Sequence, residues 1–154
     1  MSAPRPTTYV VHPPGGQENL GAARWLLESA DSLSWTPVCT LDAIVPDTGV
    51  AARVQGHHVA VFRLADGRLF AIDNVDPKAG ASVLARGLVG NLGDTLVVAS
   101  PLYKHHFDLH TGQCLELPEF AVRTHAVRVG DGQVQVALSP GVAHQPLKHH
   151  TVSA

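Results

Sequence analysis

The feature that most constrains the fold is a series of short apolar runs separated by glycine-containing turns. Residues 50–54 and 59–64 are rich in valine and partly alternate between apolar and polar positions, and Gly56 lies between them. A pair of residues, Asp66-Gly67, then separates the second run from another at 68–72. Because Asp-Gly is a typical centre of a two-residue hairpin turn, residues 59–64 and 68–72 are expected to pair as antiparallel strands.

The same alternation of short runs and tight turns continues as far as residue 138. The further expected strands cover residues 95–99, 107–108, 113–115, 127–129 and 133–138. A second Asp-Gly pair, at 131–132, marks the turn of a terminal hairpin. Short strands with regular turn signals predict an all-β fold, an antiparallel β-sandwich or a small barrel.

The length of 154 residues allows one ordinary domain with tails. Hydrophobic residues make up 45% of the chain but aromatic residues only 5%, so Val, Leu and Ala are expected to fill the core. We expect the β domain to cover residues 34–138 and a flexible tail to cover 139–154. Residues 1–33 are expected to form a partly disordered arm with a short helix over 17–31. This arm is a candidate for docking on the body or a partner, or for self-association.

Charge and hydropathy exclude several classes of partner. The net charge is −2 and the Lys and Arg residues are scattered, which argues against nucleic acid and against an anionic membrane surface. No apolar run approaches the roughly 20 residues that a membrane-spanning helix needs. The first residues also lack the apolar core of a signal peptide, so a cytoplasmic location is expected.

Two segments resemble the cluster-binding loops of Rieske iron–sulfur domains. Residues 100–112 read Ser-Pro-Leu-Tyr-Lys-His-His-Phe-Asp-Leu-His-Thr-Gly, and the Rieske pattern is Cys-Pro-x-His-Gly-x-x-Phe-Asp-x-x-Thr-Gly. Ser100 therefore stands at the thiolate position and Tyr103 at the imidazole position. Residues 73–81 align with the loop that carries Cys-Pro-His, and here Asp76 and Lys78 replace the two ligands. A Rieske centre needs two thiolates and two imidazoles, so the resemblance implies a Rieske-like fold without its cluster ligands.

The full set of motifs resembles one family, the small subunit of assimilatory NAD(P)H-dependent nitrite reductase. The matching pieces lie at residues 35–39, 56–63, 71–77, 82–87 and 97–115. The Asp-Pro and Ser-Pro-Leu-Tyr-Lys pieces separate this family from true Rieske ferredoxins. The resemblance implies stacked antiparallel sheets with two loops at one tip. It also implies a subunit that acts by association with a large subunit, which would hold FAD, siroheme and an iron–sulfur cluster and reduce nitrite to ammonium with NAD(P)H.

The degenerate ligand positions have two expected roles. Asp76 is expected to accept a hydrogen bond or salt bridge from Lys78, Lys104 or Arg86 and so tie the two loops together. Tyr103 is expected to fill the space of a ligand imidazole and hydrogen-bond across the gap. The same loops are a candidate contact surface for the large subunit. The residues assigned to the degenerate site and this contact are Asp76, Lys78, Ser100, Tyr103, Arg86, Lys104 and His106.

The sequence gives little support for a metal site or a catalytic site. The ten histidines include three adjacent pairs, but neighbouring residues of a strand point to opposite faces and cannot chelate one ion together. Cys39 and Cys114 are expected to be small buried apolar residues, with no disulfide implied. No phosphate loop, dinucleotide fingerprint or nucleophile elbow occurs. No catalytic, cofactor-binding or metal residue is therefore predicted, and the alternatives to the subunit role are a Rieske-type electron-transfer ferredoxin and a stand-alone regulatory or interaction domain.

Overall fold

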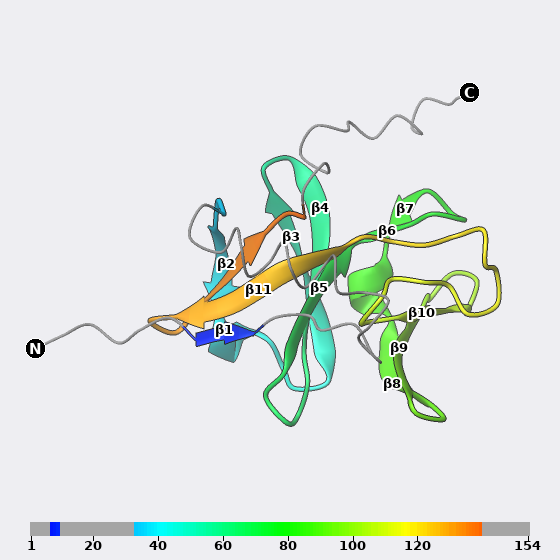
Figure 1. Ribbon diagram of the computed structural model, residues 1–154, viewed down its shortest axis with the longest axis horizontal. Coiled ribbons are helices and arrows are strands. Elements are labelled where there is room, and N and C mark those ends of the chain that lie inside the picture. The colour runs from blue at the N-terminus through cyan, green and yellow to red at the C-terminus, as the bar shows by residue number, and fades with distance from the viewer. Residues whose placement is uncertain (1–6, 10–32, 140–154) are drawn as a thin grey trace, which may run out of the picture.

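Antiparallel sheets make up the part of the chain that the computed structural model describes, residues 7–9 and 33–139 (Figure 1). The largest sheet has the order β2 (Thr36–Thr40), β12 (Gln133–Ala137), β11 (Thr124–Gly130), β5 (Leu69–Asp73), β4 (His57–Arg63) and β3 (Thr48–Val54), and β1 (Thr7–Tyr9) also pairs with β11. Its two end strands, β2 and β3, contact each other, so the sheet curls almost into a barrel. The expected all-β architecture is confirmed.

Two smaller sheets lie beside this curled sheet and form the tip of the molecule (Figure 1). One contains β10 (His106–Asp108), β9 (Thr95–Ala99) and β8 (Leu88–Leu92), and the other pairs β6 (Val75–Asp76) with β7 (Ala81–Ser82). Two single turns of 3-10 helix complete the described elements, η3 (Leu41–Ala43) and η4 (Leu84–Arg86). The helix expected over 17–31 lies outside the described residues. Within those residues, no helix is long and apolar enough to cross a membrane.

The hairpins expected from the turn residues are confirmed. Strands β3 and β4 pair from Thr48–Arg63 to Val54–His57, and β4 and β5 pair around the Asp66-Gly67 turn. Between β3 and β4, Gln55 and Gly56 have φ values of 51° and 84°. Positive φ at both central residues gives the turn whose twist matches that of the flanking strands. Glycine at the second position adopts this conformation without a Cβ clash.

The structure differs from the expectation in five additional strands, β1, β2, β6, β7 and β8, and in one expected strand that is reduced. Strands β2 and β8 were not expected, since β2 contains Pro37, and Gly90 and Asn91 lower the strand propensity of β8. The strand expected at 113–115 is reduced to two isolated bridges, Phe107–Cys114 and Gln113–Ala121. The physical reason is a side-chain contact: the Gln113 amide donates to the carbonyls of Cys114, Pro118 and Phe120 and holds residues 114–120 in a loop.

The core is filled mainly by aliphatic side chains, as the composition predicts. The middle of β4, Val59 to Phe62, is fully buried on both faces because η4 packs against β3 and β4 on one side of the sheet. Phe62 and Phe107 are the largest fully buried side chains. Burial of this apolar surface is the main term that stabilises the scaffold under the tip.

Candidate functional site

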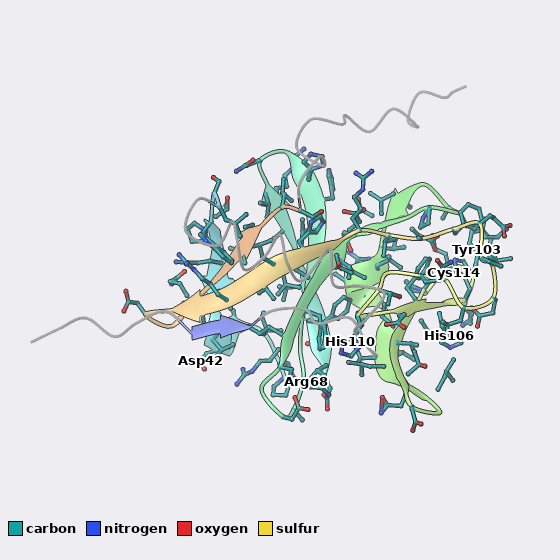
Figure 2. The ribbon with its side chains drawn as sticks, viewed as in Figure 1. Asp42, Arg68, Tyr103, His106, His110 and Cys114 are labelled. Carbon is teal, nitrogen blue, oxygen red and sulfur yellow. The ribbon has the colours of Figure 1, made fainter. Side chains whose placement is uncertain are left out.

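The candidate site is formed by the tip loops, defined as residues 74–82 and 100–105. Tyr103 and His106 lie at this end of the molecule, on the side opposite Asp42 (Figure 2). The second tip loop is closed by two backbone hydrogen bonds, from the Ser100 N–H to the His105 carbonyl and from the Lys104 N–H to the Ser100 carbonyl, both 2.9 Å long. Lys104 has a φ of 64° and stands where the Rieske pattern has glycine. The positive φ at Lys104 is a conformation that glycine adopts readily, which fits the glycine of the pattern at this position.

The first tip loop is anchored by Asn74, whose side chain is almost fully buried. Its carbonyl oxygen Oδ1 accepts a 2.7 Å hydrogen bond from the Ala85 N–H, and its backbone carbonyl accepts from Val83 and Leu84. The Asn74 N–H donates to the His58 carbonyl on β4. One buried amide thus fixes the start of the loop to η4 and to the main sheet. No role was expected for Asn74 from its sequence position.

A buried hydrogen bond between Asp76 and Ser100 joins the two tip loops. The Ser100 hydroxyl donates to Oδ2 of Asp76 over 2.5 Å, and both side chains are inaccessible to solvent. Oδ1 of Asp76 accepts from the backbone N–H groups of Lys78, at 2.9 Å, and Ala79, at 3.4 Å. The carboxylate therefore accepts hydrogen bonds from uncharged donors of both loops.

The expected donors to Asp76 are corrected in part: Lys78 does donate a hydrogen bond, but through its backbone N–H, and neither Lys104 nor Arg86 is a partner. Among the described residues, no side chain of a lysine or arginine pairs with this carboxylate; its neighbours are Ser100, two backbone amides and His105. The physical reason is burial. A lysine or arginine at this depth would have to lose the hydration of its own charge, whereas a serine hydroxyl fits without that cost.

These contacts determine the charge state of Asp76. Burial alone raises the pKa of a carboxyl group by disfavouring its charged form. For Asp76 the hydrogen bonds from Ser100, Lys78 and Ala79, together with the nearby His105, outweigh burial and hold its pKa below the usual value. The ionised form of Asp76 is therefore the one that the folded tip stabilises.

His105 fills the space beneath the tip, and sequence analysis missed it. The ring is 5% exposed, and its Nε2 lies 3.4 Å from Oδ1 of Asp76. The same ring packs edge-on against Phe107, with a centroid separation of 5.2 Å. The available signal was its spacing from Phe107: residues two apart in an extended segment share a face, and His105 immediately precedes β10.

Tyr103 also requires a correction, because it does not fill the gap between the loops. Its side chain is 53% exposed, and its ring stacks on His105 at 6.0 Å with the planes 22° apart. The Lys78 ammonium lies over the outer side of the Tyr103 ring, 5.0 Å from the centroid. A column of side chains therefore runs from solvent to the core, in the order Lys78, Tyr103, His105 and Phe107.

The remaining predicted residues lie around this column. Lys104 and Arg86 are exposed, and Arg86 ends η4. His106 is half-buried and binds Glu116, which sequence analysis missed: Nδ1 lies 2.6 Å from Oε2, and the His106 N–H donates to Oε1 over 2.7 Å. Burial raises the pKa of Glu116, but the two hydrogen bonds from His106 and its ring charge outweigh this, so the pKa is lowered.

The residues at the degenerate positions do not fit a Rieske cluster. A carboxylate, an ammonium, a hydroxyl and a phenol replace the two thiolates and two imidazoles that hold two irons. The carboxylate and hydroxyl are bound to each other, and the His105 ring occupies the space beneath them. Cys39 and Cys114 are free thiols, and burial raises the pKa of Cys39. In the described part of the chain, no three His, Cys, Asp or Glu side chains are grouped so that they could hold a metal ion.

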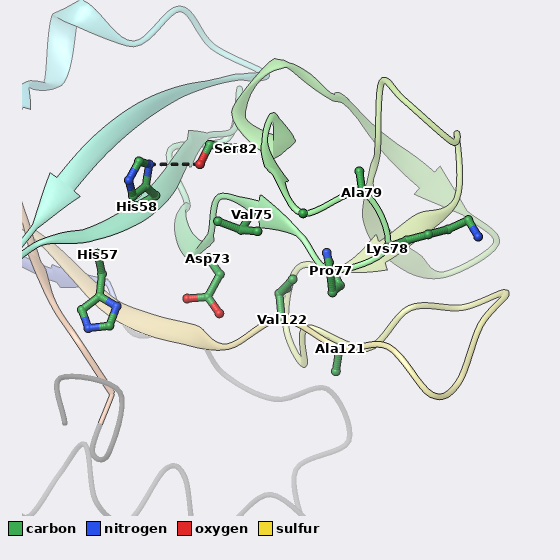
Figure 3. Close-up of a pocket in the computed structure, with 11 residues that line it drawn as sticks. His57, His58, Asp73, Val75, Pro77, Lys78, Ala79, Ser82, Ala121 and Val122 are labelled. Atoms are coloured by element: carbon green, nitrogen blue, oxygen red, sulfur yellow. Dashed lines mark hydrogen bonds between the residues drawn. The ribbon is translucent and has the colours of Figure 1, made fainter. Parts of the chain in front are cut away.

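A pocket of about 620 Å³ borders the first tip loop (Figure 3). Its walls come from the start of β4, the end of β5 and the first tip loop, and Val122 lies across from them. Three of its polar side chains are engaged within the protein. His58 Nδ1 lies 3.0 Å from the Ser82 hydroxyl, and Asp73 accepts hydrogen bonds from His125 Nε2 and the Arg123 N–H. The pocket therefore lies beside the tip loops, and three of the polar side chains that line it are already hydrogen-bonded within the protein.

Comparison with known proteins places this geometry in a family. A family model described as a Rieske-like [2Fe-2S] domain matches residues 34–137. The nitrite reductase (NADH) small subunit of Salmonella typhimurium is 46% identical over 103 residues, which cover 66% of this chain and 95% of that protein. The crystal structure of an NADH-dependent nitrite reductase small subunit from Mycobacterium tuberculosis has a TM-score of 0.66 at 41% identity, and the match covers 70% of this chain and 96% of that one.

One further relative is a much longer polypeptide. A nitrite reductase NAD(P)H large subunit of Klebsiella oxytoca contains a segment 41% identical to this chain over 105 residues. The segment corresponds to 68% of this chain and only 11% of that protein. Sequence, fold and the altered tip loops lead to the same assignment: this chain belongs to the Rieske-like domain family and, within it, to the nitrite reductase small subunits.

Proposed function

We propose that this chain is the small, non-cluster-binding subunit of an NAD(P)H nitrite reductase and acts by binding the large subunit. The observation that carries the proposal is the tip itself. In this chain the Asp76–Ser100 hydrogen bond joins the two loops at positions where the Rieske pattern has metal ligands, and Lys104 has a positive φ where that pattern has glycine. NAD(P)H, FAD, siroheme and an iron–sulfur cluster would then belong to the large subunit, and this chain would reach the reaction only through surface contact.

The relative from Klebsiella oxytoca supports the choice of partner. There the homologous segment is part of the polypeptide that is named as the large subunit. A domain that is covalently joined to a partner in one protein is well placed to bind that partner non-covalently in another. This argument favours the subunit role over a stand-alone regulatory domain.

The exposed part of the tip is the proposed contact surface, defined as Lys78, Leu102, Tyr103 and Lys104. Leu102 is 50% exposed and Tyr103 53% exposed, and the two lysines flank them. Aromatic and long cationic side chains on a rigid loop are typical anchors of protein interfaces. Asp76, Ser100 and His105 would act beneath this surface by positioning it.

The contact surface can be tested by coexpression with the large subunit. The double variant Tyr103→Ala, Lys104→Ala is expected to weaken capture of the large subunit by about tenfold or more, since it removes two central anchors. Val45→Ala is the matched control, because Val45 is exposed and follows shortly after Asp42, which lies on the opposite side of the molecule (Figure 2). Equal capture by the double variant and wild type would refute this surface.

The second candidate function, a Rieske-type electron-transfer ferredoxin, is distinguished by metal content. The purified chain is expected to contain no stoichiometric iron and to lack visible absorbance, because the donor set at the tip does not suit a [2Fe-2S] cluster. Iron analysis and a visible spectrum of protein prepared without oxygen are the measurements. Two irons per chain would overturn the subunit proposal in its non-cluster form.

A further inference from the structure

We propose that two copies of this chain associate through β8, pairing antiparallel about Gly90. Strand β8 is hydrogen-bonded to β9 on one side, and among the described residues no strand covers its other edge (Figure 1). Its sequence, Leu-Val-Gly-Asn-Leu, contains no charge and no proline. Open edges are normally protected by such residues, because an unprotected edge is a template for pairing with another strand.

The outer face of β8 is apolar and exposed. Leu88 is 79% exposed and Leu92 is 45% exposed. These residues are four apart on a strand and therefore share a face. Val89 lies on the opposite face and packs against the core. The open edge thus carries one largely exposed leucine, Leu88, and one that is about half exposed, Leu92.

The sequence of β8 is complementary to itself in one antiparallel register. When Gly90 lies opposite Gly90 of a second copy, Leu88 lies opposite Leu92 of that copy, and Val89 opposite its Asn91. Leu92 and Thr95 close the β8–β9 hairpin as a hydrogen-bonded pair, so by alternation Val89 and Asn91 turn their N–H and C=O groups outward. The register therefore places outward-facing backbone groups opposite each other.

Charge at the two ends of the strand favours the same register. Arg86 lies just before β8 and Asp94 just after it, and both are exposed. In the proposed pairing, Arg86 of each copy lies near Asp94 of the other copy, so the two-fold symmetry creates two such contacts. Such isologous contacts are the usual basis of two-fold dimers. A single five-residue strand buries little surface, so the dimer is expected to be weak and dependent on concentration.

The first test is a cross-link at the symmetry axis. A Cβ at Gly90 would meet no atom within 4 Å, so Gly90→Cys is expected to fold. Two thiols facing each other in a non-hydrogen-bonded pair are within disulfide reach. Under mild oxidation, Gly90→Cys is expected to yield about tenfold more disulfide-linked dimer than Val45→Cys, whose exposed position has no proposed contact. Equal yields would overturn the proposal.

The second test examines the register through charge, by sedimentation over a concentration series. The double variant Leu88→Lys, Leu92→Lys places lysine opposite lysine, and it is expected to weaken dimerisation by about tenfold or more. The double variant Leu88→Lys, Leu92→Glu places lysine opposite glutamate. It is expected to restore dimerisation, and added salt should weaken the restored dimer. A monomeric wild type at all concentrations would overturn the proposal. So would a dimer that is unaffected by the two lysines, or a Gly90→Cys protein that cross-links to the large subunit and never to itself.

Discussion

Asp76→Ala is expected to lower the free energy of unfolding by about 2 kcal/mol, because it removes the buried carboxylate that accepts from Ser100 and from the part-buried N–H groups of Lys78 and Ala79. Each orphaned buried donor costs roughly 1–3 kcal/mol, while the Ser100 hydroxyl can rotate and recover part of its loss. Since domains of this size are stable by only about 5–15 kcal/mol, the change would be large. Urea unfolding at pH 7, followed by circular dichroism, measures it.

Two matched variants separate the contributions. Asp76→Asn keeps the shape and one acceptor oxygen for the backbone amides, so its cost is expected to be about 1 kcal/mol. Ser100→Ala removes the link between the loops but leaves both amides bound to the carboxylate, and it is expected to cost a similar amount. If Asp76→Ala were no worse than Asp76→Asn, the backbone amides of Lys78 and Ala79 would not depend on this side chain.

The same variants predict a pH dependence. A carboxyl whose pKa is lower in the folded state stabilises the fold at pH values above its unfolded-state pKa, about 3.9 for aspartate, and loses this contribution as the pH falls through the folded value. The pKa of Asp76 is held low in the fold, so wild-type stability should fall on acidification. Asp76→Asn should show a smaller loss. Part of the acid sensitivity should remain, because the Glu116 pKa is also lowered.

Local sequence was sufficient to predict the hairpins but not the edge strands β2 and β8. The turns at Gly56 and Asp66-Gly67 carry their own conformational signal, so β3, β4 and β5 could be paired from sequence. Strand β8 could not, because its Gly90 and Asn91 have low strand propensity and its pairing with β9 is decided by the tertiary structure. A strand at the edge of a sheet needs less intrinsic propensity when a hairpin holds it.

The sequence was sufficient to predict which positions form the candidate site. It was not sufficient to predict all of the contacts that their side chains make. Aligning the tip loops with the Rieske pattern located Asp76 and Ser100, but long basic side chains were expected where a hydroxyl is the donor. That choice depends on burial, which a ligand pattern does not contain. His105 was missed because it stands at a variable position of the pattern, although its spacing from Phe107 indicated an inward-facing side chain.

Gly112→Ala is expected to be the most damaging single substitution of a small residue near the tip. A Cβ at this position would lie 1.9 Å from the backbone carbonyl oxygen of Val122, and Gly112 has a φ of 82°. Neither segment can move away freely. The Gly112 carbonyl accepts a 2.8 Å hydrogen bond from the Val122 N–H, and the Gly112 N–H donates to the Asp108 carbonyl over 2.7 Å.

The expected loss is about 4 kcal/mol, the sum of roughly 1 kcal/mol for a left-handed alanine and about 3 kcal/mol for the clash. This corresponds to a melting temperature lower by roughly 20 °C for a domain of this size. Gly56→Ala is the matched control: its φ is 84°, but a Cβ there meets nothing within 4 Å, so only about 1 kcal/mol should be lost. Equal thermal shifts in the two variants would mean that backbone conformation alone, and not the approach of Val122, requires glycine at 112.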